Sequence, residues 1–227
     1  LAADRGYSDA MYEYAIMAEN GKGIEMNYLE ALKYYKLAAE KGNVDSMYLY
    51  AFMNHKGKGV AQDKVEALKY FKLAAERGHT DAMVVYASLR RIGEGAEIDK
   101  KEAAKYFKIA ADRRKLQGVL CYAYMCRFGE GIETNKKEAA KYYKIGGDLG
   151  DIDSLFAYAV MLFEGEGIDI NMKEAFCIFK KLADKGHLES IYNCGHAYNT
   201  GSGVERNLEE AVKYFKLAAD KGHLESM

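Results

Sequence analysis

The chain has 227 residues, of which 49% are hydrophobic and 30% are charged, and its formal net charge is −1. A balance this close to zero provides no global attraction to nucleic acid or to an anionic membrane, so no specific nucleic-acid partner is expected. No apolar run reaches the roughly 20 residues that a membrane helix needs, so membrane insertion is not expected either.

The sequence repeats itself with a period of 36 residues. A Glu-Ala pair recurs six times at this step, from Glu30-Ala31 to Glu210-Ala211, and a Gly-x-Gly element keeps the same step. A fixed period of this size is typical of solenoids, in which each repeat packs on its neighbours. The repeats are 7–42, 43–78, 79–114, 115–150, 151–186 and 187–222. Residues 1–6 and 223–227 match the end and the start of a repeat, so we expect the chain to be cut from a longer array.

Each repeat predicts two antiparallel helices, which we call helix A and helix B. In helix A, Met47, Tyr50, Ala51 and Asn54 follow the spacing of one helical face. The Gly-x-Gly element should end helix A with a left-handed cap, because glycine adopts that conformation without strain. An Asn or Asp with Glu three residues later follows in every repeat, which is a capping-box pattern for the start of helix B.

Helix B combines large and small residues on its packing side. Tyr70 and Phe71 would fill the space between helices, while Ala74 and Ala75 allow close approach. Both connections within a repeat are short, so the two helices must run antiparallel. The sequence therefore predicts an all-α fold: a single right-handed α/α solenoid of six helix-turn-helix repeats, with a partial repeat at each end.

These residues resemble the Sel1-like repeat family, whose members are related to tetratricopeptide repeats. Residues 43–78 contain the whole pattern: a helix A with small and aromatic residues, Gly-x-Gly, Asp, Glu-Ala, an aromatic pair, Ala-Ala and a closing Gly. The family usually has Trp where this chain has Tyr70 and its equivalents, and Ile178 departs further. The resemblance implies a non-catalytic scaffold or adaptor that binds other proteins and needs no cofactor.

By analogy with tetratricopeptide arrays, helix A should line a concave surface that binds a partner polypeptide. Positions that are constant between repeats are explained by packing, so the variable positions are the candidates for recognition. The candidate partner-binding residues are Tyr48, Phe52, His55, Arg91, Leu120, Tyr124, Arg127, Phe128, Phe156, Phe163, Tyr192 and His196. An alternative for Tyr48, Leu120, Phe156 and Tyr192 is that they pack in the core.

The fourth repeat is the least regular. Arg114 replaces a closing Gly, Gln117-Gly118 replaces the Asp-Ala or Asp-Ser pair, and Gly146-Gly147 replaces Ala-Ala. One hypothesis is that the two glycines permit a kink beside an apolar patch that anchors a partner; the alternative is drift in a degenerate repeat. The patch would consist of Leu120, Tyr124, Phe128, Phe156 and Phe163.

Helix B also carries a stripe of lysines. It comprises Lys33, Lys36, Lys69, Lys72, Lys105, Lys108, Lys141, Lys144, Lys180, Lys213 and Lys216. The stripe could contact a polyanion, but a solvated face paired with the Glu at the helix start is the favoured interpretation.

The sequence offers no arrangement typical of catalysis or metal binding. His79, His187 and His223 share one repeat position and lie too far apart to hold one ion, so we interpret them as caps of helix A or as polar surface residues. The four cysteines form no disulfide framework, and free thiols favour an intracellular, cytoplasmic location. Cys177 should be the exposed thiol.

Two other functions remain as alternatives to the adaptor. A structural component of a larger assembly would use both faces of the array. A hydrolase is disfavoured, because the Sel1-like proteins associated with β-lactam binding carry a cysteine pair in each repeat and this chain does not. A small-molecule ligand is not expected.

Overall fold

The structure is a computed structural model that describes residues 7–222, and this part of the chain consists of helices joined by short turns. The predicted all-α repeat solenoid is confirmed, whereas the partial end repeats and His223 lie outside the described residues. The helices are α1 (Ser8–Asn20), α2 (Tyr28–Glu40), α3 (Val44–Lys56), α4 (Lys64–Glu76), α5 (Thr80–Ile92), α6 (Lys100–Asp112), α7 (Leu116–Phe128), α8 (Lys136–Asp148), α9 (Ile152–Glu164), α10 (Met172–Ala183), α11 (Leu188–Thr200) and α12 (Leu208–Asp220). None of the helices in residues 7–222 is long and apolar enough to cross a bilayer.

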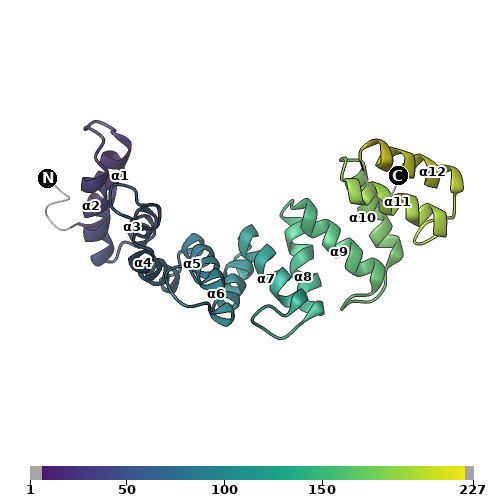
Figure 1. The fold of residues 1–227 in the computed structure, drawn as a ribbon, viewed down its shortest axis with the longest axis horizontal. Coiled ribbons are helices and arrows are strands. Elements are labelled where there is room, and N and C mark those ends of the chain that lie inside the picture. The colour runs from purple at the N-terminus through teal and green to yellow at the C-terminus, as the bar shows by residue number, and fades with distance from the viewer. Residues whose placement is uncertain (1–6, 223–227) are drawn as a thin grey trace. The chain divides into compact units, whose positions relative to one another are not determined.

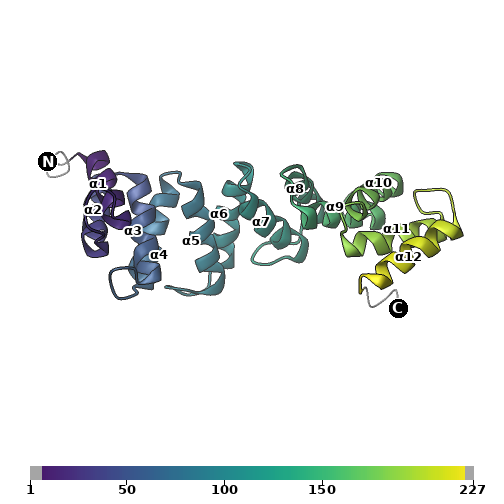
Figure 2. The ribbon, with the colours of Figure 1, turned by 90° about the horizontal axis from the view of Figure 1, so that it is seen from above.

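The described part of the chain divides into two compact units, residues 7–118 and residues 119–222. In the first unit, consecutive helices from α1 to α6 pack on one another, and in the second unit the helices from α8 to α12 do the same. Figures 1 and 2 show this stacking within each unit, with odd-numbered helices corresponding to helix A and even-numbered helices to helix B.

Local side chains and glycines set the ends of the helices. In each even-numbered helix the preceding Asn or Asp accepts a hydrogen bond from the backbone N–H of the Glu three residues on, as the capping-box pattern predicts. His79 and His187 cap α5 and α11 in the same way through Nδ1, which confirms the interpretation of these histidines. The first glycine of each Gly-x-Gly is left-handed, as expected.

The core consists of alanine layers and aromatic side chains. Ala15, Ala51 and Ala87 on helix A and Ala67 and Ala103 on helix B are fully buried. Beside them, in the first four repeats, a helix A tyrosine meets the first aromatic residue of helix B edge to face, as Tyr50 meets Tyr70 with ring centroids 4.6 Å apart. Small residues thus bring the helices close while the rings fill the remaining space.

The second glycine of four Gly-x-Gly elements, Gly59, Gly95, Gly167 and Gly203, contacts the repeat before it. A Cβ on Gly95 would lie 2.4 Å from the carbonyl oxygen of Lys64, at the start of α4, and one on Gly203 would lie 2.0 Å from that of Met172. These glycines therefore let the turn of one repeat rest on the first residues of the previous helix B. The sequence pattern alone suggested only relief of strain within the turn.

The irregular fourth repeat keeps its fold. Arg114 adopts φ 59°, which is the left-handed conformation that glycine provides at the end of the other repeats. Helix α8 continues through Gly146 and Gly147 to Asp148. A Cβ on Gly146 would lie 2.4 Å from Ser154 Oγ, and one on Gly147 would lie 2.8 Å from Leu155 Cδ1. The two glycines thus allow α8 to approach α9 closely, a different role from the kink in our hypothesis.

Candidate functional site

The first variable position of helix A is half-buried in most repeats. Tyr48, Phe156 and Tyr192 each pack on the second aromatic residue of their own helix B, with ring centroids 5.6–5.8 Å apart. Tyr48 also stacks on the capping ring of His79 at 4.5 Å, and Phe156 lies 4.8 Å from His187. Tyr48 and Phe156 therefore contact the next repeat as well as their own helix B, and all three side chains stay half-buried.

The position at the end of helix A forms ion pairs with the next repeat. His55 Nε2 lies 3.1 Å from Glu94 Oε1, and Arg127 Nη2 lies 2.6 Å from Glu166 Oε2. In both cases the carboxylate is the middle residue of the following Gly-x-Gly element. In the first repeat Glu19 and Lys58 form the same contact with the charges reversed, at 2.8 Å. The pairs thus link successive repeats, and Arg91 at the equivalent position also has an interaction partner.

Carboxylates in these pairs are held in the charged form. Hydrogen bonds from Arg127 and Lys136, despite partial desolvation, lower the pKa of Glu166 below its usual value. The pKa of Glu94 is lowered in the same way, mainly by Lys64, with His55 adding to the effect. These charged groups are already engaged within the array.

An exposed aromatic pair is the most prominent feature among the candidate residues. Tyr124 is 45% exposed and Phe128 is 59% exposed, and their ring centroids lie 4.6 Å apart on α7. The equivalent pair two repeats earlier is Phe52 and Lys56, where a lysine replaces the second ring. Large exposed rings that touch one another are unusual on a protein surface and suit partner anchoring.

A groove lies directly beside Tyr124. It has a volume of about 310 Å³. Its lining residues are Leu120, Tyr124, Tyr143, Asp151, Asp153, Ser154 and Ala157. Burial raises the pKa of Tyr143, so this phenol stays neutral. Asp153 is almost fully exposed at the edge of the groove, while Asp151 caps α9 by accepting from the Ser154 N–H at 2.7 Å. The groove therefore has apolar walls and an acidic rim.

The proposed apolar patch separates into two clusters. Leu120 and Tyr124 share the groove, and Phe128 contacts Tyr124. Phe156 and Phe163 both pack around the buried ring of Phe179 instead, with centroids 5.8 and 6.3 Å from it, and Phe163 lies 6.2 Å from His196. The second cluster is part of the packing of the fifth and sixth repeats.

The lysine stripe lies over aromatic rings. Lys69 and Lys141 each cover the tyrosine that follows in their own helix, with Nζ 5.2 Å from both centroids. Lys72 and Lys144 reach the helix A tyrosine of the next repeat, at 5.9 and 5.5 Å. Most of the stripe thus has a structural partner.

Cysteine and histidine chemistry provides no alternative site in residues 7–222. All four thiols are free there; Cys177 is exposed as expected, and Cys126 and Cys194 are buried. Burial raises the pKa of Cys194 to about 12, so it is not a nucleophile near neutral pH. Within the same residues, no group of three or more His, Cys, Asp or Glu side chains could hold a metal ion.

The family description for the Sel1 repeat matches six segments that together cover nearly all of the described helices. The matched segments are 8–43, 44–79, 80–114, 120–151, 152–187 and 188–223. The chain belongs to the Sel1 repeat family. Sel1 repeat proteins generally mediate protein–protein interactions as non-catalytic scaffolds.

Two solved Sel1 repeat structures resemble this chain. A protective antigen present in uropathogenic Escherichia coli strains is 27% identical, with a TM-score of 0.84 over 99% of this chain and 48% of its own. The chain thus spans about half the length of that protein. A Sel1 repeat protein from Oxalobacter formigenes is 24% identical, with a TM-score of 0.67 over 94% of this chain and 85% of its own, and supports the fold. A comparison with curated proteins found no match.

Two features of the site are absent from the sequence-based prediction. One is the ladder of ion pairs between residues 39 positions apart, which the recurring spacing could have suggested. The other is a groove between α8 and α9 that lies under the lysine stripe. An alignment of the repeats with one another could have indicated this groove, because Ala140 occupies the position that Leu68 occupies two repeats earlier.

Proposed function

We propose that this Sel1 repeat array is a non-catalytic adaptor that binds a partner polypeptide on the helix A side of α7 and α9. The observation that carries the proposal is the exposed Tyr124–Phe128 pair beside the groove. Exposed aromatic rings next to a pocket are the features that dominate the energy of protein interfaces. The family's general role in protein interaction agrees with this assignment.

The chemistry of the groove indicates which kind of segment it binds. Leu120, Tyr124 and Ala157 can receive an apolar side chain, and the exposed carboxylate of Asp153 can pair with a lysine or arginine beside it. We therefore expect a partner segment with one large apolar side chain and a flanking basic residue.

Paired variants in an affinity purification test the proposal. The Tyr124→Ala/Phe128→Ala variant should lose its partner, while Phe52→Ala/Lys56→Ala, which changes the equivalent positions two repeats earlier, should keep it. Both variants truncate only exposed side chains and remove no buried core, so circular dichroism should show both of them folded. Equal recovery of the partner by both variants would refute the assignment.

A titration of the recovered partner against Asp153→Lys then tests the charge preference. Reversing a charge at the rim should weaken binding by roughly tenfold at low ionic strength and by less at high salt. If the affinity changed neither with Asp153→Lys nor with the salt concentration, Asp153 would have no part in recognition.

A further inference from the structure

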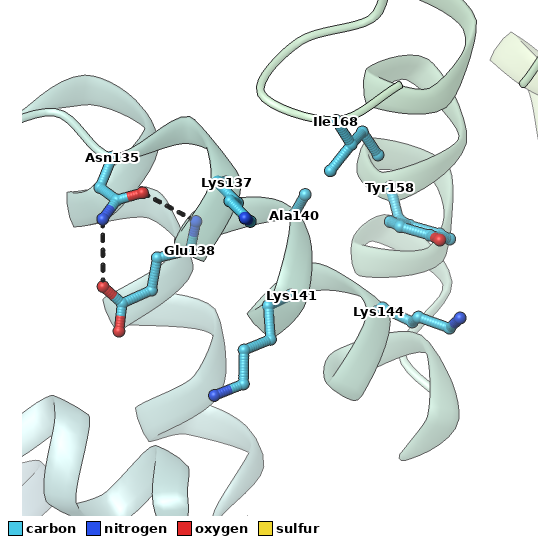
Figure 3. A pocket seen from close by; sticks show the side chains of 8 residues that line it. All are labelled: Asn135, Lys137, Glu138, Ala140, Lys141, Lys144, Tyr158 and Ile168. Carbon is cyan, nitrogen blue, oxygen red and sulfur yellow. Dashed lines mark hydrogen bonds between the residues drawn. The ribbon is translucent and has the colours of Figure 1, made fainter. Parts of the chain in front are cut away.

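A second groove lies between α8 and α9, on the side of the lysine stripe, and has a volume of about 560 Å³. Figure 3 shows Lys137 and Ala140 of α8 facing Ile168, with Tyr158 of α9 beside them. Lys144 extends beneath Tyr158, and Lys141 points away from both. The groove therefore has an apolar floor and lysines along its edges.

The equivalent groove between α4 and α5 shows why this one is open. That groove has a volume of about 330 Å³ and is lined by Val65, Leu68 and Arg90, among others. Ala140 replaces Leu68, which removes side-chain volume from the floor, and buried Leu162 replaces the charged Arg90. Lys137 replaces Val65 and adds a positive charge at the edge.

The lysines of the two grooves differ in their ion pairing. In the α4–α5 groove, Lys69 lies 3.3 Å from Glu66, and Lys72 lies 3.4 Å from Glu102. In the α8–α9 groove, no carboxylate of residues 7–222 forms an ion pair with Lys137, Lys141 or Lys144.

One carboxylate, that of Glu138, does line the α8–α9 groove. It is turned toward Asn135, whose Nδ2 donates to Glu138 Oε2 at 3.4 Å, and away from Ile168 and Tyr158. The edges of the groove thus carry positive charge that the array itself does not neutralise.

We propose that the α8–α9 groove binds an acidic polypeptide segment that carries one large apolar side chain between carboxylates. The apolar side chain enters between Ala140, Tyr158 and Ile168, and the flanking carboxylates pair with Lys137 and Lys144. Unneutralised lysines at the rim attract such a segment, while the apolar floor distinguishes it from a simple polyanion. This surface differs from the aromatic pair on α7 and prefers the opposite charge.

Fluorescence anisotropy with a labelled peptide, Gly-Glu-Glu-Phe-Glu-Glu-Gly, tests the proposal on the whole chain. Ala140→Leu should weaken its binding by about tenfold, because a leucine fills the floor as Leu68 does in the other groove. Lys137→Val, which introduces the residue found at position 65, should weaken binding by about threefold and reduce its salt dependence. Lys173→Val removes the same charge one repeat later and should leave binding unchanged.

Two further probes separate this proposal from general attraction to negative charge. A peptide with Ala in place of Phe should bind at least about tenfold more weakly, because it lacks the apolar anchor. Vesicles containing phosphatidylserine should not bind in preference to the peptide. The proposal would be overturned if the two peptides bound equally well, or if Lys137→Val and Lys173→Val weakened peptide binding to the same extent. Binding of the chain to the vesicles and not to the peptide would overturn it too. Failure of the Phe peptide to bind the unchanged chain would overturn it as well.

Discussion

A single residue at the junction of the third and fourth repeats shows how the array tolerates an irregular unit. Arg114 has a left-handed backbone conformation. The equivalent residues of the other described repeats are glycines, which are also left-handed, with φ near 90°. A non-glycine residue in that conformation costs roughly 1 kcal/mol, because Cβ crowds the following carbonyl oxygen.

We expect Arg114→Gly to raise the free energy of unfolding by about 0.5–1 kcal/mol, since glycine relieves the strain at some cost in chain entropy. Urea unfolding followed by circular dichroism measures the change. Lys41→Gly is the control, because exposed Lys41 also lies just before a closing glycine, has φ −84° and gains nothing from glycine. A lower stability for Arg114→Gly would show that no strain is stored there.

The carboxylate of Glu166 predicts a dependence of stability on pH. Arg127 lowers its pKa in the folded chain, so the unfolded chain binds a proton at a higher pH than the folded one does. The stabilisation is therefore fully present above the unfolded pKa of about 4.3, and it disappears as the pH falls through the folded value.

Unfolding of the unchanged chain and of Glu166→Gln at several pH values checks this sign. The unchanged chain should have the higher unfolding free energy at pH 7. This difference should shrink below about pH 4, where the carboxylate of Glu166 becomes protonated and, like Gln, carries no charge. A difference that stays constant from pH 7 to pH 3 would mean that the ion pair with Arg127 contributes nothing.

At the scale of the elements, the Gly-x-Gly turn is a contact between repeats as well as the end of a helix. Gly95 rests on the start of α4, whereas a Cβ on Gly23 would meet only the end of the Met17 side chain, at 3.5 Å. Both glycines are left-handed, so alanine is strained at either position, but only at Gly95 does it collide with backbone.

We therefore expect Gly95→Ala to destabilise the chain by at least about 2 kcal/mol and Gly23→Ala by about 1 kcal/mol. Thermal and urea unfolding of the two variants gives the comparison. If the two losses were equal, the turn would matter only for its own conformation and not for the packing of one repeat on the next.

The same elements show what can be predicted from the sequence. Caps such as Asn27 and glycines such as Gly57 act through neighbouring backbone, so a repeated local pattern is enough to identify them. The pairing of Glu19 with Lys58 and of His55 with Glu94 depends on how two repeats stack, and the residue types change at each step. The division of the apolar patch likewise depends on Phe179, which lies on another helix.

For the molecule as a whole, the two surfaces on α7–α9 differ in kind. The groove beside Tyr124 has aromatic walls and an acidic rim, and the α8–α9 groove has an apolar floor and lysine edges. A Sel1 repeat array with both could hold two polypeptide segments of opposite charge at the fourth and fifth repeats. Binding at one surface should then persist when the other is altered, so Ala140→Leu should leave the partner of the Tyr124 groove bound.

Site-specific photo-crosslinking tests the adaptor assignment most directly. A benzophenone amino acid in place of Phe128 leaves Tyr124 and the groove intact and should crosslink to the partner polypeptide at a defined segment. The same group in place of Phe52, at the equivalent face of α3, or of exposed Lys105 on α6 should give no crosslink to that segment. Crosslinking from position 105 and not from position 128 would contradict binding at the Tyr124–Phe128 pair.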